Sequence, residues 1–149
     1  MTDTQPFDTF AILPPIEPML AKLADDLPVG DGLLYEPKWD GFRAIVFRGG
    51  SGAYIQSRDL RPLDRYFPEL HKVFVATFPP GCVLDGEIVI VSRTGLDFDA
   101  LQLRLHPAAS RVTKLSRDTP ASFVAFDLLA SDGEDWRDRP QVERRARLE

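Results

Sequence analysis

The fold of this chain is decided by residues 42–57, which run Phe42-Arg-Ala-Ile-Val-Phe-Arg48, Gly49-Gly-Ser-Gly52, Ala53-Tyr-Ile-Gln-Ser57. The two outer parts are rich in aromatic and β-branched residues, and a glycine-rich break separates them. This pattern predicts a β-hairpin. The preceding residues, 33–39, have the same character and predict one more strand.

Residues 82–91 predict a further strand, bent or bulged at Gly86, with Asp85 and Glu87 set into an otherwise apolar run. The other expected elements are a helix capped by Asp64 and running to about residue 76 with Pro68 in its first turn, helices opening at Asp97 and Ser110, a buried strand over 121–130, and a helix over 141–149. Hairpins and single helices without a βαβ alternation predict an α+β fold with largely antiparallel sheets.

Composition points to one domain. The chain has 149 residues, 44% of them hydrophobic, and a single cysteine, Cys82, which excludes an internal disulfide or a cysteine-based zinc site and is expected to be buried. No apolar run approaches the ~18 residues of a membrane span, and the start lacks the features of a secretory signal, so we expect a soluble, cytoplasmic protein with no membrane partner. Four prolines in residues 1–18 predict an extended lead-in, followed by an ordered domain over 19–149.

The net charge of −5 argues against a protein whose whole surface binds nucleic acid. The charge is uneven, however, because residues 1–40 carry eight acidic and two basic side chains. Basic residues cluster further along, at Arg58, Arg61 and Arg65 and at Arg104, Arg111, Lys114 and Arg117. One face could therefore bind a polyanion, and the alternative is that these are ordinary solvated charges.

Lys38 is the candidate nucleophile. It lies between two predicted strands, beside Glu36 and Asp40, and Gly41 allows a tight reversal of the chain there. A lysine attacks only after losing a proton, and its ordinary pKa of ~10.4 falls with burial, a neighbouring cation such as Arg43, or a bound metal ion. The alternative is a strand-end lysine that pairs with Glu36 or Asp40.

Four segments together resemble the motifs of the covalent nucleotidyltransferases, the group of ATP-dependent DNA ligases, RNA ligases and mRNA-capping enzymes. In chain order they are Lys38-Trp-Asp-Gly-Phe-Arg43, Ser57-Arg58, Leu84-Asp-Gly-Glu87 and Phe123-Val-Ala-Phe-Asp-Leu-Leu129. The amino-acid sequences of three segments are most similar to those of small bacterial ATP-dependent DNA ligases of the C type. The segments are Tyr35–Arg43, Arg65–Leu70 and His106–Arg111. The resemblance covers nearly the whole chain.

This resemblance implies a role for each matching residue. Lys38 attacks the α-phosphate of ATP and holds AMP through a phosphoramidate bond, while Glu36 accepts from the adenine amino group, a donor that guanine lacks at that position. The remaining implied contacts are Arg43 and Glu87 to the ribose, Phe126 stacked on the base, Arg58 near the phosphates, Trp39 as a further nucleotide-binding residue, and Glu87 as a ligand of Mg²⁺ or Mn²⁺.

The pattern alone leaves plainer alternatives for several of these residues. Phe126 could be a core residue, and Glu87 could share the solvent face of its strand with Asp85. Arg58 could simply pair with Asp59 or Glu69. Asp40 could position the Lys38 segment without touching a substrate.

The resemblance also implies that the sequence is the first part of an adenylation domain. The family pattern continues with a Glu-Gly strand, a lysine-rich strand and an OB-fold domain, which this sequence does not contain. We therefore expect weak or no adenylation by this chain alone, and a parent protein that seals nicks in duplex DNA, with other DNA repair proteins as candidate partners. The alternatives are an RNA ligase or capping-type enzyme, a non-catalytic nucleotide-binding module, or a piece completed by a second polypeptide.

Overall fold

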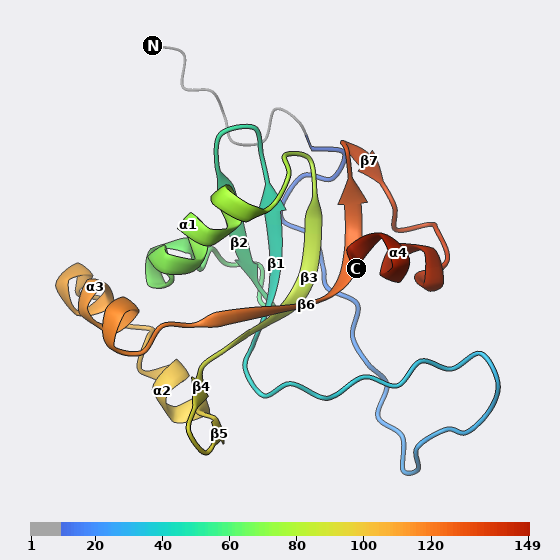
Figure 1. Cartoon of the computed structure of the whole chain (residues 1–149), viewed down its shortest axis with the longest axis horizontal. Helices are drawn as coiled ribbons and strands as arrows, with labels where there is room; N and C mark the ends of the chain where they lie inside the picture. The colour runs from blue at the N-terminus through green and yellow to red at the C-terminus, as the bar shows by residue number, and fades with distance from the viewer. Residues whose placement is uncertain (1–9) are drawn as a thin grey trace.

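The computed structural model describes residues 10–149 and is built around a five-stranded sheet (Figure 1). The strand order is β2-β1-β3-β6-β7, and every pair is antiparallel. The strands are β1 (Phe42–Arg48), β2 (Ala53–Ser57), β3 (Val83–Val89), β6 (Ser122–Ser131) and β7 (Glu134–Asp135); β4 (Val91–Ser92) and β5 (Gly95–Leu96) form a separate two-stranded ribbon. The α+β, antiparallel prediction is confirmed.

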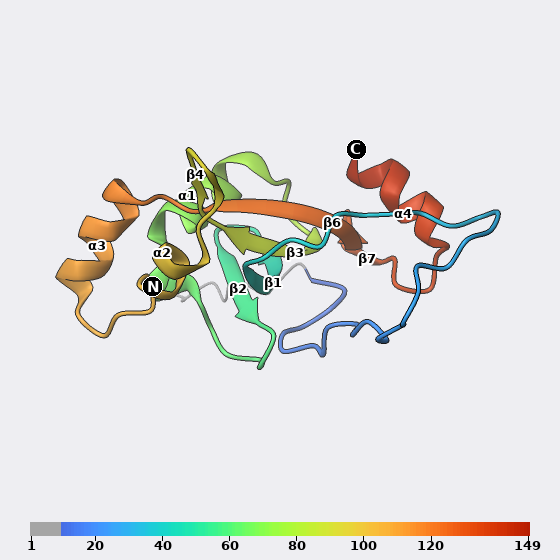
Figure 2. The same cartoon turned by 90° about the horizontal axis from the view of Figure 1, so that it is seen from below.

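In the described residues, four α-helices and one 3₁₀ turn accompany the sheet. They are η1 (Asp64–Tyr66), α1 (Pro68–Thr77), α2 (Phe98–Gln102), α3 (Ala109–Asp118) and α4 (Gln141–Leu148). The long strand β6 runs between α3 at one end of the molecule and α4 at the other, as both views show (Figures 1 and 2). No helix in residues 10–149 is long and apolar enough to cross a membrane.

The alternation of side chains along β1 separates two core clusters. Ala44 and Val46 face the cluster that contains Phe74 of α1, whereas Ile45 and Phe47 face a second cluster closed by Ile12 of the N-terminal segment. Hydrogen bonds fix that segment to the sheet, because the buried amide of Gln56 bonds both the backbone N–H (2.8 Å) and the carbonyl (2.7 Å) of Ile16. Residues 1–9 of the predicted lead-in lie outside the described part.

Two predictions about local structure are wrong. Residues 33–39 form no strand, because they lie in a long irregular loop that extends away from the sheet, where their backbone meets no partner strand (Figures 1 and 2). Asp64 caps no helix: its carboxylate accepts from the backbone N–H of Ile55 (2.9 Å), and α1 begins only at Pro68. Pro68 does occupy the first turn, as expected.

Arg104 is not part of a surface basic cluster. Its side chain is fully buried and bonds the carbonyls of Thr119 and Tyr66, each at 2.9 Å, and the carboxylate of Glu69. Arg104 therefore ties the α2–α3 region to η1 and α1. Cys82 is buried, as predicted, and burial raises the pKa of its thiol to about 11.

Candidate active site

The predicted site residues line one cavity of about 660 Å³. Its walls come from the irregular N-terminal segment, β1, the turn after β2, β3, β6 and α4. All seven candidates are present: Glu36, Lys38, Trp39, Arg43, Arg58, Glu87 and Phe126. Leu20, Ala21, Leu34, Tyr35, Pro37, Val124, Ala125 and Arg145 complete the lining, and none of these eight was singled out from the sequence.

Lys38 lies near the end of the irregular segment, four residues before β1 begins at Phe42. Its side chain is 91% exposed, and Nζ lies 3.3 Å from Oδ1 of Asp40, so the predicted pairing with Asp40 is present. Gly41 then passes against β3 so closely that an added Cβ would lie 2.0 Å from the carbonyl oxygen of Ile88. Only glycine permits this approach, which fixes where the Lys38 segment joins the sheet.

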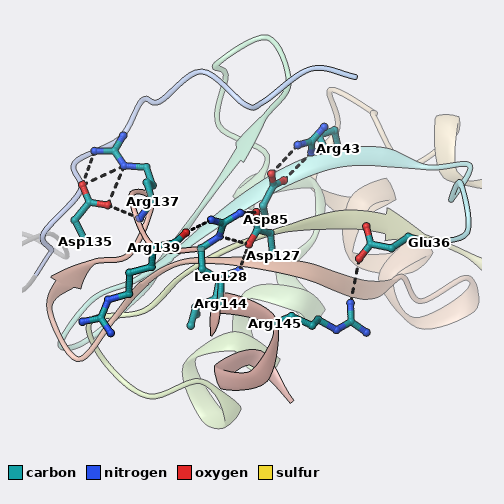
Figure 3. A network of polar contacts seen from close by, with 10 residues as sticks. All are labelled: Glu36, Arg43, Asp85, Asp127, Leu128, Asp135, Arg137, Arg139, Arg144 and Arg145. Atoms are coloured by element: carbon teal, nitrogen blue, oxygen red, sulfur yellow. Dashed lines mark hydrogen bonds and ion pairs between the residues drawn. The ribbon is translucent and has the colours of Figure 1, made fainter. Parts of the chain in front are cut away.

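Arg43 is held by Asp85. Nε and Nη2 of Arg43 each lie 2.6 Å from a different oxygen of the Asp85 carboxylate (Figure 3). Nη2 also donates to the carbonyl of Met19 at 3.0 Å. The hydrogen bonds that Arg43 donates to the Asp85 carboxylate raise the pKa of Arg43. Asp85 is buried, so the alternative that it lies with Glu87 on a solvent face of the strand is wrong. Asp85 also neutralises the charge of Arg43, so Arg43 is not an unpaired cation beside Lys38.

Phe126 and Glu87 lie beside Arg43. The guanidinium carbon of Arg43 is 5.1 Å from the centre of the Phe126 ring, a cation–π distance. Phe126 is half-buried and borders the cavity, so it is not a closed core residue. Glu87 pairs with Arg43 in the β1–β3 register, and burial raises the pKa of its carboxyl against the opposing effects of the Gly41 backbone, Arg43 and Lys38.

Arg58 projects from a constrained turn after β2. Backbone hydrogen bonds join Ser57 to Arg61 (2.8 Å) and Leu60 to Ser57 (3.0 Å), and Leu60 has a φ of +64°, in the left-handed region. Arg58 is exposed and has no ion pair within residues 10–149, while Glu69, one suggested partner, binds Arg104 instead. A second hollow of about 490 Å³ adjoins the cavity and shares Arg43, Arg58 and Glu87 with it.

Two neighbouring arginines of α4 make ion pairs with other elements, and one of them, Arg145, lines the cavity. Arg144 bonds Asp127 of β6 at 2.8 and 3.2 Å, and Nη1 of Arg145 bonds Oε1 of Glu36 at 3.1 Å (Figure 3). Sequence analysis missed these contacts, because no local pattern links residues so far apart in the chain.

No group of three or more His, Cys, Asp or Glu side chains that could hold a metal ion occurs in residues 10–149. Glu87 therefore belongs to no such group in these residues. Mg²⁺ is commonly bound by one or two carboxylates together with substrate phosphates. The protein residues described here do not form a metal site by themselves.

The chain belongs to the ATP-dependent DNA ligase domain family, whose model matches residues 18–149. It is 55% identical over 138 residues to DNA ligase C2 of Mycolicibacterium smegmatis and 54% identical over 137 residues to DNA ligase C of Mycobacterium tuberculosis. These matches cover 93% and 92% of this chain but only 38% of each relative.

A solved structure agrees with this assignment of fold. The structure described as mycobacterial DNA ligase D complexed with ATP and MES matches with a TM-score of 0.58 and 30% identity, over 76% of this chain and 34% of that one. The family resemblance drawn from the four motifs is therefore confirmed, and the individual roles of the site residues stay predictions.

Proposed function

We propose that this chain forms the nucleotide-binding part of an ATP-dependent DNA ligase, and that the whole protein seals nicks in duplex DNA in the cytoplasm. One observation carries the proposal: six residues from four motifs, together with Glu36 just before the first motif, line a single cavity. Family membership and the names of the relatives support the DNA substrate.

Lys38 is the proposed nucleophile. Its Nζ attacks the α-phosphorus of ATP, the N–P bond forms, the bond to the pyrophosphate oxygen breaks, and the amine proton leaves to solvent. Within residues 10–149 the amine of Lys38 is held only by Asp40, so the exposed side chain is free to turn toward a bound phosphate. AMP then passes to the 5′-phosphate of the nick, and the 3′-hydroxyl displaces it to seal the strand.

The nucleotide is oriented by the walls of the cavity. Phe126, which borders the cavity, stacks on the base, and the guanidinium of Arg43 lies beside the same ring. Arg43 and Glu87 contact the ribose from adjacent strands, Glu36 accepts from the adenine amino group, and Trp39 borders the nucleotide.

Arg58 contacts phosphate. Its planar guanidinium suits bidentate contact with phosphate oxygens, and it has no competing ion pair in the described part of the chain. Mg²⁺ or Mn²⁺ is expected from the family resemblance to enter with the nucleotide and contact Glu87. Because the described residues do not make a site for it, we derive no step through the ion.

The test is incubation of the 149-residue chain with α-labelled ATP and magnesium, beside a Lys38→Ala control. We expect ATP binding but weak or no covalent label, because stabilising a transferring phosphoryl group needs cations beyond those gathered here. Strong Lys38-dependent label would show that this chain suffices for the first step. Saturable binding unaffected by Lys38→Ala, with no adduct in a full-length protein, would favour a non-catalytic module.

The nucleotide and the nucleic acid need their own comparison. An RNA ligase or a capping-type enzyme shares the lysine chemistry but differs in substrate. We expect ATP to be preferred to GTP, and nicked DNA to be sealed in preference to nicked RNA by the full-length protein. Preference for GTP or for nicked RNA would move the protein into one of those groups.

A further inference from the structure

Glu36 and Arg145 are 109 residues apart in sequence, yet both line the proposed nucleotide cavity and form an ion pair there. Nη1 of Arg145 donates to Oε1 of Glu36 at 3.1 Å, as Figure 3 shows. Both side chains are partly exposed, at 36% for Arg145 and 39% for Glu36. The pair therefore lies where an entering nucleotide can reach it.

The orientation of the Arg145 side chain is supported by an ion pair with Glu149. Nε of Arg145 lies 2.6 Å from Oε1 of Glu149, the residue that follows α4, which leaves the terminal nitrogens of Arg145 to reach Glu36. The preceding residue, Arg144, points about 100° away around the helix and bonds Asp127. Because Asp127 follows Phe126 in β6, this contact ties α4 to the strand that carries the proposed base platform.

The chemistry of a carboxylate explains what the pair can do. An ionised carboxylate only accepts hydrogen bonds, and it has two oxygens to do so. Arg145 takes Oε1 of Glu36, and Oε2 has no hydrogen bond within residues 10–149. Holding one oxygen restricts the orientations of the carboxylate, which reduces the side-chain freedom that nucleotide binding would otherwise have to restrict.

We propose that Arg145 is a positioning residue for nucleotide selection. By holding Oε1 of Glu36, it directs Oε2 toward the amino group of adenine, a donor. Guanine carries a carbonyl oxygen at that position, and two acceptors repel each other. This inference rests on the proposed function, since it requires that the cavity bind ATP through Glu36.

The experiment measures ATP and GTP binding by NMR titration of the 149-residue chain, which also reports that each variant is folded. Arg145→Gln should bind ATP about tenfold more weakly while GTP binding changes less than about twofold, so that the preference for ATP falls. Arg145→Lys keeps a charged donor and should restore most of the preference.

Two further variants serve as controls. Arg147 lies on the same helix and pairs with Asp132 at 2.9 Å, so Arg147→Gln should leave both affinities unchanged. If Arg145 acts through Glu36, the double variant Glu36→Gln/Arg145→Gln should bind ATP no more weakly than Glu36→Gln alone.

The outcomes separate this inference from the proposed function. If the unchanged chain binds ATP and Arg145→Gln keeps the same ATP-to-GTP preference, the positioning role is wrong and the nucleotide cavity stands. Equal loss for both nucleotides in Arg145→Gln also overturns it, because that result indicates a general effect on α4. If the unchanged chain binds neither nucleotide, the cavity assignment fails and the inference fails with it.

Discussion

The Arg43 guanidinium and the Asp85 carboxylate face each other in a two-point ion pair, with Nε–Oδ1 and Nη2–Oδ2 both at 2.6 Å. Asp85 is almost fully buried, whereas Arg43 keeps one edge open to the cavity beside Phe126. Burial raises the pKa of Asp85, and Arg43 opposes that rise. The buried carboxylate thus serves to hold a cation at the edge of the site.

Asp85→Asn should destabilise the chain by about 2–3 kcal/mol. The asparagine amide can accept one of the two contacts, but its NH₂ group then faces the guanidinium, and a partly buried cation loses its counter-charge. Denaturant unfolding followed by circular dichroism measures the change. A loss below ~0.5 kcal/mol would mean that the pair contributes little to the fold.

Glu87→Gln should alter the pH dependence of stability. Burial raises the pKa of Glu87 above its ordinary 4.5, so the folded chain holds this proton more tightly than the unfolded chain. The stability that the protonated Glu87 carboxyl contributes is fully present below pH 4.5, and it is lost as the pH rises through the raised pKa of Glu87 in the folded chain. Glutamine does not titrate, so Glu87→Gln should be the more stable protein at neutral pH.

The measurement for Glu87 is the free energy of unfolding of both proteins below pH 4.5 and at neutral pH. Only the difference between the proteins matters, because Asp85 titrates in both with its pKa raised in the same direction. A difference that stays constant with pH, or one that favours the unsubstituted chain more at neutral pH, would contradict the account.

Cys82 should be inert in the folded chain. It is 4% exposed, and its pKa of about 11 leaves little thiolate at neutral pH. An aromatic disulfide reagent should react with it fully in denaturant and negligibly without. Rapid stoichiometric reaction of the native chain would show that the region between Cys82, Leu84 and Leu128 opens readily.

Gly86→Ala should destabilise the chain by about 1–3 kcal/mol, because an added Cβ would lie 2.3 Å from the carbonyl oxygen of Val124 and 2.5 Å from the ring of Phe123. Gly50→Ala is the matched control: its Cβ meets nothing within 4 Å, so its effect should stay within about 0.5 kcal/mol. Equal stability of the two variants in thermal unfolding would refute the close packing at Gly86.

Much of the sheet could be predicted from the sequence, because strand patterns and turn residues act locally. The hairpin of β1 and β2 follows from its β-branched runs and the break at 49–52, and the bend at Gly86 coincides with a register shift between β3 and β6. Residues 33–39 have the composition of a strand, but their backbone pairs with no strand of the sheet. Composition alone does not show whether a partner strand lies within reach.

The sequence predicts only those site residues that belong to, or directly adjoin, the four motifs. The motif residues were recognised as a set, and the structure brings them to one cavity. The sequence did not predict the ion pairs around the site, which join Asp85 to Arg43, Asp127 to Arg144, and Arg145 to Glu36. Each of these ion pairs joins separate elements, so its geometry depends on tertiary packing that a single sequence does not display.

The central claim is that Lys38 becomes adenylylated, and the most direct test places residues 1–149 in the matched segment of Mycolicibacterium smegmatis DNA ligase C2, with ATP and magnesium. Peptide mass spectrometry should find an adenylyl group on Lys38, and Lys38→Ala should abolish it. A nick that already carries AMP bypasses Lys38, so its sealing by both proteins controls for folding. A chimera that seals this nick but never gains an adenylyl group at Lys38 would contradict the account.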